Sequence, residues 1–200
     1  CRCQLVPRFS DVRSRHAFAA EIQMTHDNQG VYLDHAATTP LDPAVLAAME
    51  PYLSAVYGNP SSIYRLGQEA RAAVDSARAK VASVLGCAPG EVLFTSGATE
   101  SSNLALRGVA WAARLAAPSV TPPHIVTTAI EHHAVLHTAE SLALQGFRVT
   151  FVQPDTDGIV SAAAIAEAIE PDTCIISVML ANNETGAIQL WDTQTGTLSK

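Results

Sequence analysis

Residues 125–152 read IVTTAIEHHAVLHTAESLALQGFRVTFV. The pattern predicts a strand over Ile125–Thr128, a helix from about His133 to Leu144 that Gly146 ends, and a second strand over Val149–Val152. A helix between two strands is typical of a β–α–β unit, whose strands run parallel in one sheet. This segment therefore predicts an α/β fold.

The same alternation continues on both sides of this segment. Val92–Thr95 is predicted to be a buried strand, followed by a helix from about Thr99 to Leu115. A helix over Ser161–Ile169 and a strand over Cys174–Met179 are predicted after it. Repeated β–α units predict a mostly parallel sheet with helices on both faces.

The N-terminal half carries weaker signals. Val31–Leu33 is predicted to be a short strand. Asp42 and Pro43 indicate an N-cap and a first helical residue, which open a helix to about Leu53. Apolar residues at helical spacing predict an amphipathic helix over Gly67–Leu85.

The composition is that of a globular protein. Of 200 residues, 48% are hydrophobic and 16% are charged, which excludes global disorder. The net charge of −7 argues against sequence-independent nucleic-acid binding. No apolar run reaches the roughly 18 residues of a membrane span.

Four cysteines without a CxxC spacing argue against a disulfide scaffold and a zinc ribbon, and favour a reducing compartment, with a cytoplasmic location expected. The first 20 residues carry four Arg and one Asp, a pattern compatible with a transit peptide and hence with a mitochondrial location. A plain extension is the alternative.

Residues 95–101 join a predicted strand to a predicted helix. Gly97 is expected to permit a tight turn, and the small Ala98 lets a ligand approach the backbone. N–H groups at a helix start, together with the helix dipole, bind anions such as phosphate. The spacing is neither a Walker A loop nor GxGxxG. In the alternative, this is a capping turn in which Ser96 or Thr99 satisfies the helix N–H groups.

Histidines follow the next strand. His132, at the carboxyl end of a strand, can stack on a flat cofactor ring or move protons. His133 and His137 lie four residues apart near Glu131 and Glu140, a spacing that can bind zinc. The HExxH order is absent and no third ligand is fixed, so a solvated helix face is the alternative.

A third polar segment, Ala181–Gly186, follows the hydrophobic strand that precedes it. The amide of Asn183 could hydrogen-bond a cofactor oxygen or a substrate carboxylate, although Asn and Gly are also ordinary turn residues. All three segments follow parallel strands, and such strands end at one edge of a sheet. Together they predict a single site for a phosphate-bearing cofactor.

Five motifs, in this order, resemble the cysteine desulfurases, which are class V aminotransferase-type enzymes of PLP fold type I with selenocysteine lyases as near relatives. The resemblance runs from about Val31 to Gln189. The motifs are YLDHAATTP (residues 32–40), YGNPSS (57–62), TSGATESSN (95–103), EHHAV (131–135) and NNETG (182–186).

The resemblance implies a cofactor, pyridoxal 5′-phosphate (PLP), and roles for single residues. Ala98 and Thr99 would hold the phosphate. His132 would stack on the pyridine ring as a catalytic residue that moves protons, and Asn183 would contact the phenolic oxygen and the substrate.

The resemblance also implies a reaction and partners. Thr38 and Thr39 would line the substrate side. The family converts L-cysteine to L-alanine and passes sulfur to an enzyme persulfide for a sulfur-acceptor or Fe–S scaffold protein. Intact members are homodimers, and neither nucleic acid nor membrane is an expected partner.

Family members are about twice as long and supply further groups after the position of Gln189: an Asp beside the pyridine nitrogen, the Schiff-base lysine, a nucleophilic cysteine, and an Arg for the substrate carboxylate. None has a match in this sequence. The two lysines are Lys80, expected to point to solvent, and Lys200. Cys87 and Cys174 are expected to be small buried residues.

Three regions are therefore expected: an N-terminal extension over residues 1–30, poorly ordered; a partial PLP-dependent transferase large domain over 31–189; and a divergent tail over 190–200. The tail resembles one strand and turn of a WD-repeat blade. We expect the 200-residue chain alone to be inactive. A non-catalytic module that docks onto an intact subunit or another partner is the alternative, and a metal hydrolase that uses His133 and His137 is a third.

Overall fold

The computed structural model describes residues 31–117, 121–189, 191–192 and 197–198. It divides the chain into two units, Cys1–Thr39 and Pro40–Lys200. In the first unit, residues 35–37 form a turn in which the Ala37 N–H donates to the Asp34 carbonyl oxygen at 3.1 Å. The strand predicted at Val31–Leu33 is wrong: these residues are exposed and pair with no strand in the described chain.

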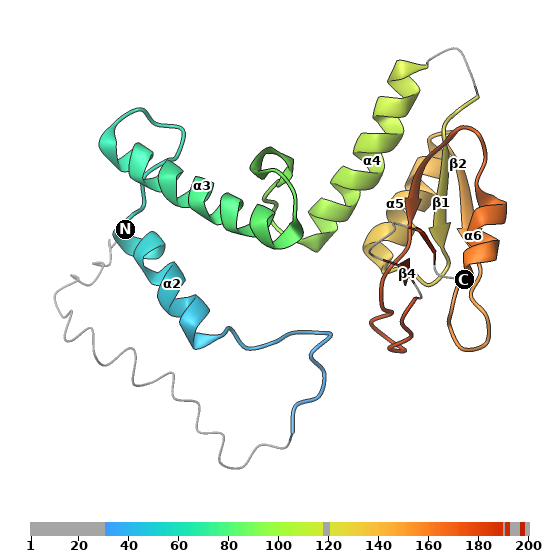
Figure 1. Cartoon of the computed structure of the whole chain (residues 1–200), viewed down its shortest axis with the longest axis horizontal. Coiled ribbons are helices and arrows are strands. Elements are labelled where there is room, and N and C mark those ends of the chain that lie inside the picture. The colour runs from blue at the N-terminus through green and yellow to red at the C-terminus, as the bar shows by residue number, and fades with distance from the viewer. Residues whose placement is uncertain (1–30, 118–120, 190, 193–196, 199–200) are drawn as a thin grey trace, which may run out of the picture. The chain divides into compact units, whose positions relative to one another are not determined.

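The second unit contains a three-stranded parallel sheet (Figure 1). Its order is β2 (Arg148–Val152), β1 (His124–Thr128), β3 (Thr173–Ser177). Ile125 lies opposite Val149 on one side and Ile175 on the other. The predicted parallel α/β architecture is confirmed, with each strand within two residues of its expected bounds.

Helices cover both faces of this sheet. One face carries α4 (Ala98–Ala116) and α5 (His133–Leu144), and the opposite face carries α6 (Ala162–Ala168). Successive side chains of a strand point to opposite faces, so β1 serves two cores. The first core gathers Leu106, Ala110, Ile125, Leu142 and Phe147, and the second gathers Val126, Val152, Val160 and Ile165.

Two further helices precede this layer. In α2 (Pro43–Ser54), the Asp42 carboxylate caps the start by accepting the N–H of Ala44 at 2.7 Å. Helix α3 (Arg65–Leu85) ends at Gly86, whose φ of 68° is in the left-handed region that glycine favours. Both helices are predicted correctly to within two residues at each end.

The strand predicted at Val92–Thr95 is wrong. After a 3₁₀ turn, η1 (Pro89–Glu91), the backbone is extended at Val92 but pairs with no strand among the described residues. Leu93 is 70% exposed. Arg78 of α3 holds this segment instead, because its guanidinium donates to the Val92 carbonyl oxygen and lies 4.9 Å from the centre of the Phe94 ring.

Two short strands follow the main layer. β4 (Trp191–Asp192) pairs antiparallel with β5 (Thr197–Leu198). The predicted turn residues between them, as well as the N-terminal extension 1–30, lie outside the described residues. Among the helices that the structure describes, none has the length and apolar character that a membrane crossing requires.

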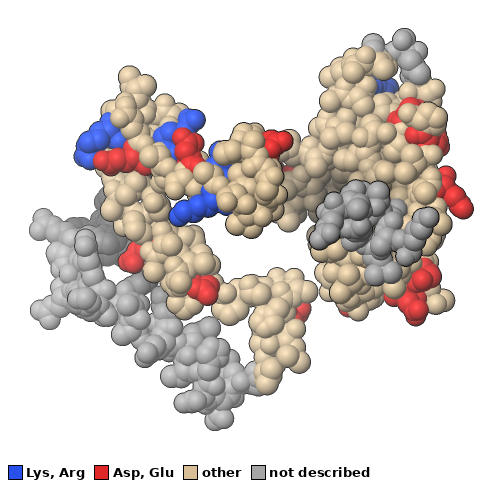
Figure 2. Space-filling model, viewed as in Figure 1, with Lys and Arg blue, Asp and Glu red and all other residues tan. Residues whose placement is uncertain are grey.

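Charge is distributed unevenly along the second unit. Over the face seen in Figure 2, Lys and Arg atoms gather on α3, whereas Asp and Glu atoms prevail over the α/β layer. Between residues 121 and 189 the one basic side chain is Arg148, which pairs with Glu170 and Asp172. Residues 121–189 thus contain no cluster of Lys and Arg of the kind that nucleic-acid binding requires.

Candidate functional site

The start of α4 is held in place by its own residues. The Glu100 carboxylate accepts both the backbone N–H and the hydroxyl of Ser96, each at 2.7 Å. Both hydrogen bonds lower the pKa of Glu100, and the bond from the Ser96 side chain has the larger effect. The hydroxyls of Thr95 and Ser101 both donate to the Gly97 carbonyl oxygen, at 3.1 and 3.3 Å.

No side chain of the described residues caps α4. The Ser96 hydroxyl is used by Glu100, and Thr99 supplies no cap, so the alternative of a side-chain-capped turn is wrong. The first N–H groups of a helix lack intrahelical acceptors. Those of Ala98 and Thr99 are therefore available to an anion at the positive end of a 19-residue helix.

The chain bends at Ser96 and Gly97, but this bend does not require the conformational freedom of Gly97. Its φ of 164° and ψ of 179° describe an extended backbone that any residue adopts. A side chain built on Gly97 meets nothing within 4 Å. The glycine leaves the space in front of the helix start open.

His132 forms the N-cap of α5. Its Nδ1 accepts the backbone N–H of Ala134 at 3.1 Å. Because Nδ1 is an acceptor there, the neutral ring carries its proton on Nε2. The cap therefore fixes both the orientation and the tautomer of the imidazole.

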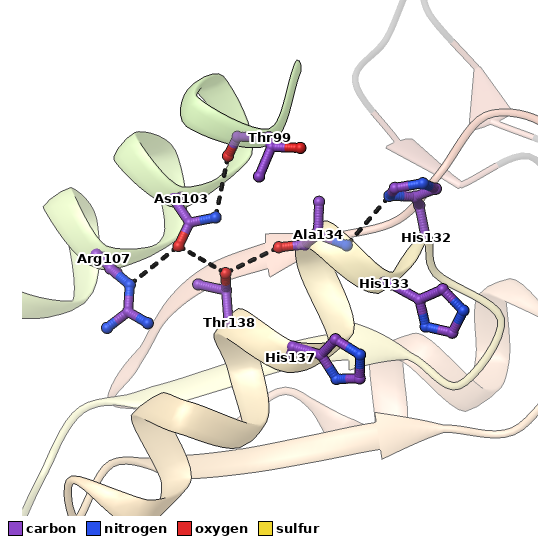
Figure 3. Close-up of a pocket in the computed structure, with 8 residues that line it drawn as sticks. All are labelled: Thr99, Asn103, Arg107, His132, His133, Ala134, His137 and Thr138. Carbon is purple, nitrogen blue, oxygen red and sulfur yellow. Dashed lines mark hydrogen bonds between the residues drawn. The ribbon is translucent and has the colours of Figure 1, made fainter. Parts of the chain in front are cut away.

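Thr99 and His132 line the same groove, which lies between the N-terminal halves of α4 and α5 and has a volume of about 420 Å³ (Figure 3). The groove is lined by Thr99, Asn103, Arg107, His132, His133, Ala134, His137 and Thr138. The groove therefore extends from Thr99, in the first turn of α4, to the ring of His132.

Asn103 is the centre of a polar seam between the two helices (Figure 3). Its Oδ1 accepts from Thr138 Oγ1 at 2.8 Å and from Arg107 Nε at 3.1 Å, and its Nδ2 donates to the Thr99 carbonyl oxygen at 3.0 Å. Arg107 also donates to Ser141 Oγ at 3.1 Å. This seam fixes the first turn of α4 against α5. From the sequence, Asn103 is the last residue of the TSGATESSN motif and no seam is predicted, although the four-residue spacing of Asn103 and Arg107 is a signal for such a contact.

The loop after β3 contains Asn183, which does not line this groove. Its side chain is exposed and donates to Glu184 Oε1 at 2.8 Å. The preceding residue, Asn182, donates from Nδ2 to the Ile130 carbonyl oxygen at 2.9 Å. The structure thus brings the loop that carries Asn183 against the segment that leads to His132.

Glu131 is a buried carboxylate three residues after the end of β1, with 7% of its surface exposed. Its Oε1 accepts the Met179 N–H at 2.6 Å and the Thr128 hydroxyl at 3.2 Å. Burial raises the pKa of Glu131, an effect that these two hydrogen bonds oppose. From the sequence, Glu131 is a neighbour of possible zinc ligands and the first residue of the EHHAV motif, and no buried carboxylate is predicted there.

The structure gives little support to a zinc site at His133 and His137. The rings of His133 and His137 stack, with centroids 5.2 Å apart, and His137 Nδ1 lies 3.0 Å from Glu140 Oε2. No group of three metal-binding side chains occurs in the part of the chain that the structure describes, so the zinc alternative lacks a third ligand.

The other predicted residues are placed as follows. Lys80 is exposed on α3, as predicted. Cys87 and Cys174 are half-buried free thiols, less buried than expected. Burial raises the pKa of the Cys174 thiol, which makes it a poor nucleophile. Thr38 and Thr39 end the first unit, and their substrate-side role stays a prediction.

The geometry fits a flat ring that carries a phosphate. Two free N–H groups at a helix start suit a phosphate, an imidazole beside the same groove suits a flat ring, and the groove has room for a small molecule. No part of this fit depends on a metal ligand.

Known proteins are similar to this chain in sequence and in fold. The family described as Aminotransferase class-V matches residues 31–195. Cysteine desulfurase IscS of Methanosarcina thermophila is 48% identical over 163 residues, which cover 82% of this chain and 39% of the relative.

Two solved structures are also similar. One, titled NIFS-like protein, has a TM-score of 0.75 and 42% identity and covers 80% of this chain and 43% of that one. Another, titled SspA in complex with cysteine, has a TM-score of 0.74 and 40% identity over 80% of this chain and 45% of that one. The chain spans about two-fifths of the length of the curated relative it matches. The chain belongs to the class V aminotransferase family, and its relatives are cysteine desulfurases of the IscS and NifS type.

Proposed function

We propose that this chain is the phosphate-binding part of a cysteine desulfurase and that its cofactor is pyridoxal 5′-phosphate. The observation that carries the proposal is the uncapped start of α4, where no side chain of the described residues accepts the Ala98 and Thr99 N–H groups and where Thr99 lines a groove together with His132. One relative was solved in complex with cysteine, which supports L-cysteine as the family substrate.

Each predicted site residue has a definite task in this proposal. The N–H groups of Ala98 and Thr99 bind the phosphate, and the dipole of α4 favours its negative charge. His132 lies against the cofactor ring and moves a proton at Nε2, while its Nδ1 stays on the α5 cap. Asn183 contacts the phenolic oxygen, and Thr38 and Thr39 line the substrate side. The cofactor, when bound, supplies the electron sink.

The complete reaction would release L-alanine and pass sulfur to a persulfide for a sulfur-acceptor or Fe–S scaffold protein. It needs a lysine amine at the cofactor. Lys80 is exposed on α3, and Lys200 has no matching motif around it. We expect the purified 200-residue chain to release no sulfide from cysteine, and turnover by this chain would contradict that expectation.

Equilibrium dialysis of the chain against PLP and against pyridoxal, which lacks the phosphate, tests the binding proposal. A phosphate held by two charge-assisted hydrogen bonds is worth about 1.5–3 kcal/mol per bond. Two such bonds total about 3–6 kcal/mol, so PLP should bind at least about a hundredfold more tightly than pyridoxal. Equal affinities for the two would show that α4 does not hold the phosphate.

A second candidate function is a non-catalytic docking module, which the surface of α2 favours. This helix has no buried residue, and Met49, Tyr52 and Leu53 are 43%, 52% and 69% exposed. Apolar surface of this kind marks an interaction site. Size-exclusion chromatography with an intact cysteine desulfurase subunit tests it: co-elution supports docking, whereas a strictly monomeric chain in the mixture counts against it.

A further inference from the structure

Two side chains cross-link the segment that follows β1 to the segment that follows β3. Glu131 Oε1 accepts the Met179 N–H at 2.6 Å, and Asn182 Nδ2 donates to the Ile130 carbonyl oxygen at 2.9 Å. The partners are 48 and 52 residues apart in the chain. In both bonds the segment after β3 donates and the segment after β1 accepts, and each segment provides one side chain and one backbone group.

Glu131 is an unusual residue for a merely structural bond. It is 7% exposed, and no ion pair with it occurs among the described residues. A carboxylate buried without a cation is costly, and both of its hydrogen bonds fall on one oxygen, Oε1. An amide or an apolar residue would carry a smaller desolvation penalty at this position.

Asn182 organises its own loop as well as the cross-link. Its Oδ1 accepts the N–H groups of Glu184 and Thr185, both at 2.9 Å, and the Thr185 hydroxyl at 3.2 Å. Together with the Nδ2 bond to Ile130, one side chain sets both the shape of the loop and its attachment to the strand end.

The cross-links stand next to the two residues that face the cofactor in the proposed function. His132 directly follows Glu131, and Asn183 directly follows Asn182. We propose that Glu131 and Asn182 are positioning residues that together set the spacing between the His132 imidazole and the Asn183 amide. This inference rests on the proposed function for the reason why the spacing matters, but the cross-link itself can be tested without a cofactor.

The test measures hydrogen–deuterium exchange of the peptide spanning residues 178–185, and binding of PLP and of inorganic phosphate, on the full 200-residue chain. Glu131→Ala removes the acceptor, and Glu131→Gln keeps an oxygen in the same place. Asn182→Asp replaces the donor to Ile130 with a carboxylate oxygen, keeps an acceptor for the loop N–H groups, and serves if Glu131→Ala does not fold. Glu167→Ala, at an exposed position on α6, is the control.

We expect Glu131→Ala to speed exchange of this peptide about tenfold and to weaken PLP about tenfold, with the affinity for inorganic phosphate unchanged, since phosphate needs only the start of α4. Asn182→Asp should act in the same direction, and Glu131→Gln and Glu167→Ala should match the wild type. Two results would distinguish a positioning role from a general loss of stability. They are wild-type behaviour of Glu131→Gln and a loss of affinity for PLP but not for inorganic phosphate.

Three results overturn the inference. They are unchanged exchange in both Glu131→Ala and Asn182→Asp, equal loss of PLP and phosphate binding, and failure of Glu131→Gln to restore the wild-type values. If the wild type binds neither ligand, the proposed function fails, and the exchange of the variants still decides whether the cross-link sets the loop.

Discussion

The two helices that precede residue 98 and the layer that follows it have similar apolar patterns but very different burial. In α3 the apolar positions Val81 and Val84 are 37% and 87% exposed. In the layer, Leu106, Ile125 and Leu142 are at most 2% exposed. The difference shows that a periodic apolar pattern identifies the face that can be covered, whereas burial requires a neighbouring element to cover it.

Substitutions on α5 give the largest effect and test whether burial or pattern decides stability. Leu142 is fully buried and Leu144 is 91% exposed, so the two leucines form a matched pair on one helix. Leu142→Ala should destabilise the layer by about 2–5 kcal/mol, and Leu144→Ala should change it by about 0.5 kcal/mol or less. Urea unfolding followed by circular dichroism measures both, and similar costs for the two would contradict the comparison.

Helix caps in the two regions test the same comparison, with a smaller expected effect on stability. Asp42 caps α2, and the Ser161 hydroxyl accepts the Ala164 N–H at 3.1 Å to cap α6. Each Ala substitution should cost about 1 kcal/mol of local helix stability. Ser161→Ala should lower the urea midpoint of the layer, because α6 packs on its core. Asp42→Ala should speed amide exchange in α2 and leave that midpoint unchanged. A shifted midpoint in Asp42→Ala would show that α2 unfolds together with the layer.

The buried carboxylate of Glu131 should make stability depend on pH, with an effect smaller than that of the helix caps. Burial raises the pKa of Glu131 in the folded state above its ordinary value. The favourable contribution of Glu131 to the free energy of unfolding is therefore complete below the ordinary pKa, and it is lost as the pH rises through the raised pKa. Urea midpoints measured from acidic to neutral buffers should fall over that interval in the wild type relative to Glu131→Gln. Parallel curves for the two proteins would mean that Glu131 does not titrate there.

The predictions from sequence succeed where both partners of a contact lie in one short stretch. The β–α–β unit of residues 124–152 carries two strands and their covering helix, and all three form as predicted. Val92–Thr95 has the same apolar character but no strand beside it in the described chain, so it stays unpaired.

The candidate site shows the same limit. The sequence identifies the segments around Ala98 and His132, because local turn and strand signals surround them. It leaves open whether a side chain caps α4, which depends on Glu100 engaging Ser96. The bond from Glu131 to Met179 spans 48 residues and leaves no local pattern to read.

Removal of one N–H group tests the central claim most directly. Ala98 and Ala162 are the first residues of α4 and α6, where proline is tolerated and deletes a single donor. Ala98→Pro should weaken PLP binding at least about tenfold, the worth of one charge-assisted hydrogen bond. Pyridoxal binding should not change, and Ala162→Pro should leave both affinities unchanged. Full PLP affinity in a folded Ala98→Pro chain would contradict the account.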